Sequence, residues 1–151
     1  SQKQYGALIV IIRETGIRTY IESGELLGAK LSKSILTSIF FPKSSLHDGA
    51  VIIKGNVVEA ARCTLPLSAT TQTDGENLGM RHRAGLGISE QADVISVIVS
   101  EETGGISIAE NGKLSSGLSK DSLRKKLREA FITPTPKGWK ALFEQFKGHK
   151  Q

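Results

Sequence analysis

The sequence is poor in cysteine, in aromatic residues and in long apolar runs, and each scarcity excludes a class of protein. The single cysteine, Cys63, rules out a disulfide framework and any zinc site built from several cysteines. Aromatic residues make up 5% of the chain, too few for the stacking platforms with which single-strand and sequence-reading RNA-binding proteins hold bases. No apolar run reaches the roughly 18 residues of a membrane-spanning helix, and the first residues lack the pattern of a signal peptide.

What is present is the composition of a folded domain with an excess of positive charge. The 151 residues are 38% hydrophobic and 23% charged, which is enough for one domain with its own core. The 20 lysines and arginines exceed the 15 acidic residues, so the net charge is +5. A basic chain suits a polyanion, a membrane surface or nucleotide phosphates as its neighbour, and charge alone does not choose among them.

The hydrophobic pattern predicts short strands joined by tight turns. Two continuous apolar runs, residues 7–12 and 94–99, are typical of buried strands. Gly55-Asn56 separates two further apolar runs and predicts a hairpin of residues 50–53 and 57–61. Asn111-Gly112 is a turn signal of the kind that needs positive φ, and it follows the alternating residues 106–108.

Apolar residues at helical spacing predict helices between these strands, at residues 31–40, 81–90 and 119–131. Pro42 ends the first helix, and Ser119 is suited to cap the last. The polar stretch 70–76 predicts a loop. The pattern indicates an α/β fold in which a mixed β-sheet is flanked by helices on both sides. We expect the domain to span residues 1–133 and residues 134–151 to form a partly helical tail.

Three polar segments carry candidate chemistry, and the first lies at the entry to a predicted strand. Here His47 and Asp48 precede Gly49 and Ala50. The carboxylate suits a hard cation or a sugar hydroxyl, the imidazole can join it as a ligand, and the two small residues allow a ligand to approach the backbone. The structural alternative is that Asp48-Gly49 forms a turn that closes a loop.

The second segment lies at the start of a predicted helix and contains Met80, Arg81, His82 and Arg83. Two arginines at a helix N-terminus oppose the helix dipole, which is unfavourable unless an anion binds there. The arginine fork also matches phosphate oxygens. The alternative is a solvated basic turn that is paired with nearby acids.

The third segment, residues 100–105, follows the predicted strand at 94–99. The carboxyl end of a buried strand is a frequent place for ligand sites in α/β sheets. Glu101 and Glu102 are candidate metal ligands, and the hydroxyl of Ser100 is a candidate phosphate contact. The alternative is an acidic, glycine-rich hairpin turn.

Together these segments resemble the membrane-type class of the diadenylate cyclase family, the bacterial enzymes that make cyclic di-AMP. The resemblance covers the chain from Tyr5 to Phe131. It is carried by Asp48-Gly49-Ala50, by Arg81-His82-Arg83, and by the motifs LHDGAVI at 46–52, ARCTLP at 61–66 and VSEETGG at 99–105. Several separated motifs in the right order make it specific.

The resemblance implies an enzyme of the diadenylate cyclase fold that condenses two ATP molecules. Each subunit would bind one ATP and a divalent metal, manganese, magnesium or cobalt. Two subunits would face each other as a homodimer, so that each 3′-hydroxyl attacks the α-phosphate of the other ATP. The products would be cyclic di-AMP and two pyrophosphates.

The resemblance also implies roles for single residues. Asp48 would orient or activate the 3′-hydroxyl, while Arg81 and Arg83 would bind phosphates. The metal would lie near His47, Asp48 and Glu101. The substrate would contact Gly49, Ala50, Leu65 (at adenine), Met80, His82, Ser100 and Glu102.

One departure from the family pattern supports an alternative function. Met80 stands where relatives usually have threonine, and a thioether cannot donate a hydrogen bond. The alternative is a catalytically weak module of the same fold that binds ATP or a cyclic dinucleotide. A nucleic-acid partner is not expected, because aromatic residues are few.

Membrane-type relatives begin with transmembrane helices, which this sequence does not contain. We therefore expect the chain to be the catalytic domain of a longer protein, held at the cytoplasmic face of the cell membrane. The resemblance further implies a membrane regulator and phosphoglucosamine mutase as partners.

Overall fold

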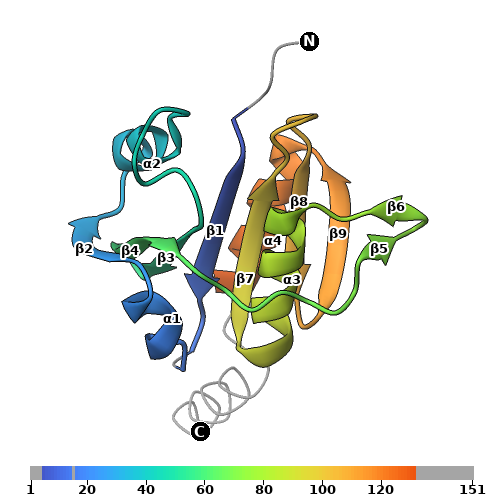
Figure 1. Cartoon of the computed structure of the whole chain (residues 1–151), viewed down its shortest axis with the longest axis horizontal. Helices are drawn as coiled ribbons and strands as arrows, with labels where there is room; N and C mark the ends of the chain where they lie inside the picture. Colours follow the sequence, from blue (N-terminus) through green and yellow to red (C-terminus); the bar gives the residue numbers. More distant parts are fainter. Residues whose placement is uncertain (1–4, 15, 132–151) are drawn as a thin grey trace, which may run out of the picture. The chain divides into compact units, whose positions relative to one another are not determined.

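The computed structural model of the chain describes residues 5–14 and 16–131 (Figure 1). The chain divides into two compact units, Ser1–Leu118 and Ser119–Gln151. The first unit holds the sheet and three helices, and the described part of the second is one helix, α4 (Lys120–Phe131). The tail expected over residues 134–151 lies outside the described residues.

The first unit is built on one mixed sheet, as the sequence predicts. Seven strands follow the order β2-β4-β3-β1-β7-β8-β9, and β1 pairs with β3 in parallel while the other neighbours pair antiparallel. The pair includes the central strand, β1, and it can be parallel because α1, β2 and α2 form a crossover connection from β1 to β3. The strands are β1 (Ala7–Ile12), β2 (Glu25–Lys30), β3 (Ala50–Lys54), β4 (Val57–Cys63), β7 (Val94–Val99), β8 (Ile106–Glu110) and β9 (Lys113–Leu118).

Helices cover both faces of this sheet, which confirms the predicted layers. On one face, α1 (Arg18–Glu22) and α3 (Met80–Gln91) pack on a cluster that includes Val10 and Ile52, both fully buried. On the other face, α2 (Lys33–Phe40) packs Ile39 and its neighbours against side chains of β1, β3 and β4. The core therefore lies on both sides of β1 and β3 and anchors the loops at their ends.

Local signals account for most elements. Both predicted hairpins are present, and α3 extends one residue beyond each end of its predicted range. Ser32 caps α2 by accepting from the Ile35 amide at 3.1 Å, and α2 ends before Pro42. The predicted cap of α4 is also confirmed, because the Ser119 hydroxyl accepts from the Ser122 amide at 3.0 Å.

Two elements have no recognisable signature in the sequence, and one predicted loop contains a hairpin. Helix α1 has no buried residue, and five of the six residues of β2 are exposed, so neither shows the periodicity by which elements are recognised. The predicted loop at 70–76 contains a small hairpin, β5 (Gln72–Thr73) and β6 (Glu76–Asn77). Its turn is Asp74-Gly75, with positive φ at both residues. The pair Asp-Gly is typical of such hairpin turns.

The described residues include no helix that is both long and apolar enough to span a membrane.

Close packing fixes α3 against the loop that follows β4. A Cβ at Gly87 would collide with the carbonyl group of Pro66, which is backbone and cannot turn aside. A Cβ at Gly85 would lie 2.9 Å from Cδ1 of Ile98, the far end of a flexible side chain. These glycines let α3 approach the sheet and the loop, which places the helix N-terminus.

Gly87→Ala should therefore destabilise the protein, although alanine usually stabilises a helix by about 1 kcal/mol relative to glycine. The collision with Pro66 should cost about 2 kcal/mol in net stability and lower the Tm by roughly 5 °C. Gly85→Ala is the matched control in the same helix, and its effect should be clearly smaller. Thermal unfolding followed by circular dichroism checks both variants. Equal melting temperatures for the two would contradict the assigned packing.

Candidate active site

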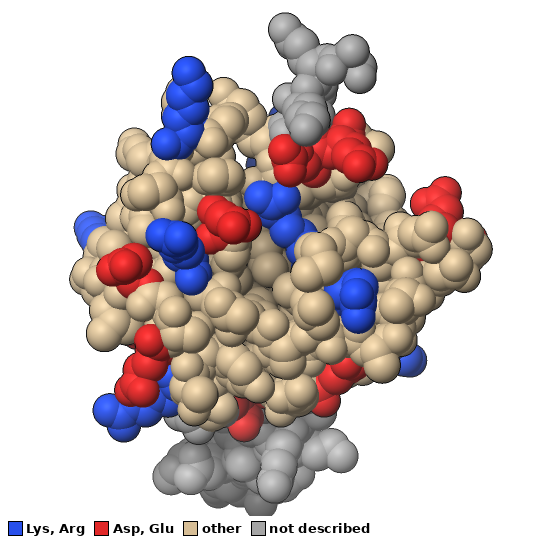
Figure 2. Space-filling model, in the orientation of Figure 1, with Lys and Arg blue, Asp and Glu red and all other residues tan. Residues whose placement is uncertain are grey.

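Two neighbouring clefts in the first unit contain most of the candidate residues. The smaller cleft has a volume of about 580 Å³ and the larger one about 920 Å³. They share three lining residues, Asp48, Met80 and Arg81, so these side chains stand at the boundary between the clefts. Figure 2 shows a hollow on the face viewed, with basic and acidic side chains at its rim. The sequence separates the first and second polar segments widely, and the fold brings them together.

The Asp48 corner depends on the absence of a side chain at Gly49. Gly49 has φ +86°, and its amide donates to Oδ1 of Asp48 at 3.1 Å. A Cβ at Gly49 would lie 2.9 Å from the carbonyl oxygen of Cys63. The turn predicted as an alternative at Asp48-Gly49 is thus present, and it also exposes the carboxylate of Asp48 to both clefts.

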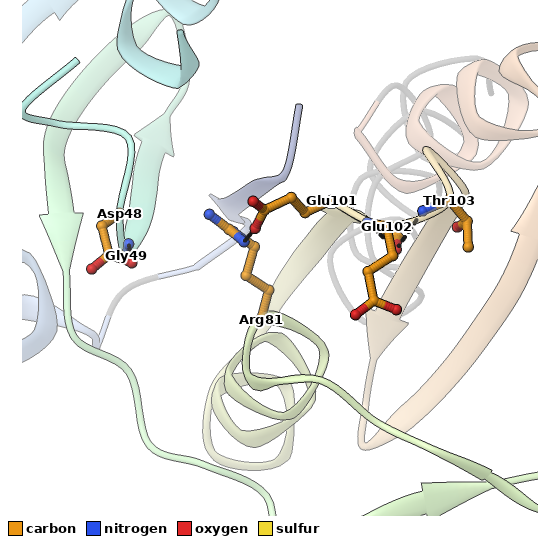
Figure 3. Close-up of polar contacts among 7 residues, drawn as sticks. Asp48, Gly49, Arg81, Glu101, Glu102 and Thr103 are labelled. Carbon is orange, nitrogen blue, oxygen red and sulfur yellow. Dashed lines mark hydrogen bonds and ion pairs between the residues drawn. The ribbon is translucent and has the colours of Figure 1, made fainter. Parts of the chain in front are cut away.

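Arg81 occupies the first turn of α3 and reaches across to the β7–β8 turn (Figure 3). Its Nη1 lies 3.2 Å from Oε2 of Glu101. Its Nε is buried and has no hydrogen-bond partner within the described ranges. A Cβ at Gly6 would lie 2.8 Å from Nη1, so Gly6 leaves the space that the guanidinium fills. An anion in either cleft would find Arg81 already positioned.

The third polar segment forms the turn between β7 and β8. The Ser100 hydroxyl accepts from the amides of Glu102 and Thr103 at 3.3 and 3.2 Å, and the Ser100 carbonyl accepts from Gly104 at 2.8 Å. The hairpin turn considered as the alternative reading is therefore present. Ser100, Glu101 and Glu102 all line the larger cleft, and Figure 3 shows Glu101 directed to Arg81 and Glu102 away from it.

Three candidate residues line neither cleft. Ala50 is fully buried in the core. Nδ1 of His47 lies 2.7 Å from the carbonyl oxygen of Ser44, so a proton on Nδ1 would leave Nε2 free. Nε and Nη2 of Arg83 both donate to the Ser68 carbonyl, at 3.2 and 3.0 Å. The arginine fork of Arg83 thus holds the loop after β4 instead of facing a cleft.

Two candidates at the start of α3 differ in their surroundings. Met80 is 64% exposed and lines both clefts. His82 lines the larger cleft, and burial lowers the pKa of its imidazole from the ordinary value of 6.5. His82 is therefore neutral at neutral pH, and it offers a substrate one hydrogen-bond donor and one acceptor but no charge.

One wall of the smaller cleft is apolar. Candidate Leu65 is buried in this wall, and its other apolar members are Leu8, Cys63, Leu67, Met80 and Ala84. Most residues that line the larger cleft have polar or charged side chains. A flat ring can pack against the apolar wall of the smaller cleft, and Asp48 and Arg81 stand at the boundary between the two clefts.

The donor set fits a metal ion that arrives with a substrate. The described residues form no group of three or more His, Cys, Asp or Glu side chains that is suited to hold a metal ion. His47, Asp48 and Glu101 are thus not gathered as a ready-made site, and Glu101 is paired with Arg81. Magnesium is usually bound through one or two carboxylates together with substrate phosphates. Asp48, at the boundary of the clefts, satisfies that requirement.

Several lining residues carry no local signal that marks them as functional. Glu25 and Arg62 line the smaller cleft, and residues of the β5–β6 hairpin line the larger one. Glu25 lies on an edge strand, Arg62 lies at an irregularity of a strand, and the others lie on a short hairpin. Among these residues, only those beside Asp74-Gly75 carry a sequence signal, because Asp-Gly is typical of a hairpin turn.

The burial of Cys63 predicts that the stability of the protein depends on pH in the alkaline range. Burial raises the pKa of its thiol from 9.0 to about 11, against the opposing effect of a hydrogen bond with the Gly24 backbone. Because the folded state disfavours the thiolate, the stabilising contribution is complete below pH 9 and is lost as the pH rises toward 11. Urea unfolding between pH 8 and 11 should show this loss in the wild type and not in Cys63→Ala. Parallel pH profiles for the two proteins would contradict the burial of the thiol.

Comparison with known proteins identifies the relatives of this chain. The profile of the family described as DisA bacterial checkpoint controller nucleotide-binding matches residues 1–114. A diadenylate cyclase of Listeria monocytogenes is 47% identical over 150 residues, which cover 99% of this chain and 54% of the relative. The cyclic di-AMP synthase CdaA of Bacillus subtilis is 49% identical over 131 residues, covering 87% of this chain and 48% of the relative. The chain spans about half the length of these curated relatives.

Solved structures show the same fold. A crystal structure of a double mutant of DacA from Staphylococcus aureus superposes with a TM-score of 0.79 at 45% identity and covers 84% of both chains. A protein of Bacillus cereus described as a hypothetical membrane spanning protein gives a TM-score of 0.71 at 45% identity, over 76% of this chain and 56% of that one. The matched profile, the relatives and the fold agree: this chain belongs to the diadenylate cyclase (DAC) family.

Proposed function

We propose that this domain is a diadenylate cyclase that condenses two ATP molecules into cyclic di-AMP and two pyrophosphates. The observation that carries the proposal is the meeting of Asp48 and Arg81 at the boundary of two clefts. One cleft has an apolar wall suited to a base, and most residues of the other have polar or charged side chains. Membership of a family whose relatives are named diadenylate cyclase supports the same activity.

The proposed substrate pose follows from the lining of the clefts. Adenine lies in the smaller cleft against Leu65, beside the Asp48–Gly49 corner, with Gly49 as a further contact. The phosphates lie toward Arg81, whose guanidinium is held by Glu101 and lines both clefts. Met80, His82, Ser100 and Glu102 line the space next to Arg81 and are the proposed contacts to the rest of the substrate.

The reaction needs positioning and charge neutralisation more than a covalent nucleophile. The oxygen of one 3′-hydroxyl forms a bond to the α-phosphorus of the second ATP, and the bond between the α- and β-phosphates breaks. Pyrophosphate leaves with the electron pair, and the hydroxyl proton passes to the carboxylate of Asp48, which releases it to water. The same displacement by the second 3′-hydroxyl on the first ATP closes the ring and releases the second pyrophosphate. Asp48 orients that hydroxyl and accepts a hydrogen bond from it, and Arg81 stabilises the charge that develops on the phosphates.

A divalent metal, when bound, neutralises phosphate charge at this site. We propose that Asp48 contributes to holding it, with His47 and Glu101 as the further candidates from the family resemblance. Manganese, magnesium and cobalt are the candidate ions.

In this proposal the two clefts of one subunit bind one ATP molecule, which is half of the substrate that the reaction needs. Formation of a cyclic product requires two such sites to face each other, so we propose that the active species is a homodimer of this chain. Binding of a membrane regulator and of phosphoglucosamine mutase at the cytoplasmic face of a membrane stays a prediction from the family resemblance.

A second candidate function rests on Met80. Its exposed thioether lies at the boundary of both clefts, where the family usually has a hydroxyl. Loss of that hydrogen bond favours a module that binds ATP or a cyclic dinucleotide and turns it over weakly. The two candidates differ in product formation and not in binding.

Incubation with ATP and manganese separates these candidates. The purified protein should form cyclic di-AMP, detected by chromatography and mass spectrometry. Specific activity should rise with protein concentration, because two subunits must meet around two substrates. Magnesium and cobalt provide the comparison series. Tight ATP binding without product under all three metals would favour the binding module.

Asp48→Asn tests the assigned chemistry within the site. The amide keeps the size of the side chain but removes the charge that orients the hydroxyl and helps to hold a metal. We expect product formation to fall by at least about 100-fold, since positioned proton-transfer groups contribute at this level. ATP affinity, measured by calorimetry, should fall much less.

Asp74→Asn is the matched control for this variant. Asp74 also lines the larger cleft, on the β5–β6 hairpin, but it is not assigned to the reaction. It should therefore keep most of the activity. An Asp48→Asn variant that is as active as the control would remove Asp48 from the mechanism.

A further inference from the structure

Arg62 has an unusual backbone conformation for its residue type. Within the described ranges, three residues other than glycine have positive φ: Arg62 (57°), Asp74 (53°) and Asn111 (52°). Asp74 and Asn111 precede glycines in tight hairpin turns, where Asp and Asn accept this conformation readily. Arg62 lies within β4, and arginine has no local side-chain hydrogen bond that compensates the left-handed conformation. A residue other than glycine in this conformation within a strand needs a local structural cause.

The cause is an irregularity in the pairing of β3 with β4. Ala50 pairs with Cys63 and Ile52 pairs with Ala60, so β4 has one residue more than β3 between these two pairs. A bulge of this kind changes the direction of the side chains that follow. Ala60 and Cys63 both pack in the core cluster under α1 and α3, while Arg62 is exposed and lines the smaller cleft.

The bulge is coupled to the corner that carries Asp48. A Cβ at Gly49 would lie 3.0 Å from the carbonyl carbon of Arg62 and 3.1 Å from its Cα. The backbone of Arg62 is thus the surface on which the Asp48–Gly49 corner rests. This contact places a basic side chain and the carboxylate of Asp48 along the same cleft.

The guanidinium of Arg62 has no partner among the residues that the structure describes. Among the described residues, its guanidinium has no hydrogen bond or ion pair, whereas Arg81, the other arginine of the smaller cleft, is paired with Glu101. Any described contact of Arg62 with the core is a backbone contact, which glycine would preserve. Glycine would also accept the positive φ without strain. An arginine at this position is therefore unfavourable for folding alone.

We propose that Arg62 is a substrate-binding residue whose guanidinium contacts a phosphate group of the nucleotide in the smaller cleft. The proposal rests on the proposed function, because it assumes a nucleotide in that cleft. Arg62 provides a cation that forms no ion pair within the described part of the chain, in the same cleft that Asp48 and Arg81 line. The conformational strain of arginine is retained because a flexible, charged side chain is needed there.

Arg62→Gly separates binding from folding, because the two effects have opposite signs. The variant should melt a few degrees higher than the wild type, since strain at a non-glycine residue of positive φ is released. Its affinity for ATP should fall about tenfold, the scale of a charge-assisted hydrogen bond. Its affinity for adenosine, which has no phosphate, should stay within twofold of the wild type. Arg62→Lys should retain most of the ATP affinity.

Asn111→Gly is the matched control. It removes another positive-φ side chain in a turn that lines neither cleft, so ATP affinity should not change. Calorimetric titration with ATP and with adenosine measures the affinities, and thermal unfolding measures stability.

The outcomes distinguish this proposal from the proposed function. An Arg62→Gly protein that binds ATP within twofold of the wild type would overturn the role of Arg62, as would an equal loss for adenosine and ATP. A wild-type protein that binds ATP but forms no cyclic di-AMP would overturn the activity alone. A wild-type protein that binds no ATP would overturn both.

Discussion

The contact between Gly49 and the end of β4 is the constraint on which the site depends. With no Cβ, Gly49 lies directly against the backbone of Arg62 and Cys63. This single approach turns the chain so that Asp48 faces the clefts. It also accompanies the bulge that buries Cys63 and exposes Arg62. Any side chain at residue 49 would separate the corner from β4 and would move the carboxylate, the bulge and the cleft wall together.

The two clefts differ in the charge of the side chains that line them. The acidic side chains that line the larger cleft come from the Asp48 corner, the β5–β6 hairpin and the β7–β8 turn, and they outnumber its one arginine, Arg81. Phosphates enter such a cleft favourably only with a cation, which is a physical reason for a divalent metal in the proposed reaction. The smaller cleft balances two acidic residues with Arg62 and Arg81 and provides the apolar wall.

Helix α3 contributes residues to both clefts and to the core, and Arg83 joins it to the loop after β4. Its guanidinium, which the family resemblance placed on phosphate, donates to the Ser68 carbonyl. The Ser68 hydroxyl donates to Glu90 at 2.9 Å, and Gly87 packs against Pro66. These contacts fasten the loop that carries Leu65 to the helix that carries Arg81. The two arginines of one motif thus face different neighbours, because residues two apart on a helix point in different directions.

The sequence by itself determined the elements that have a local cause. Apolar runs specified β1 and β7, turn chemistry specified the hairpins, and helical spacing with Pro42 specified α2, because each of these signals acts over a few residues. The family motifs also indicated which segments meet at the site. The tertiary structure alone decided how they meet: that Asp48 and Arg81 share cleft walls, that Arg83 turns to a carbonyl, and that a bulge exposes Arg62. These arrangements depend on packing and register between segments far apart in the chain, which no local pattern encodes.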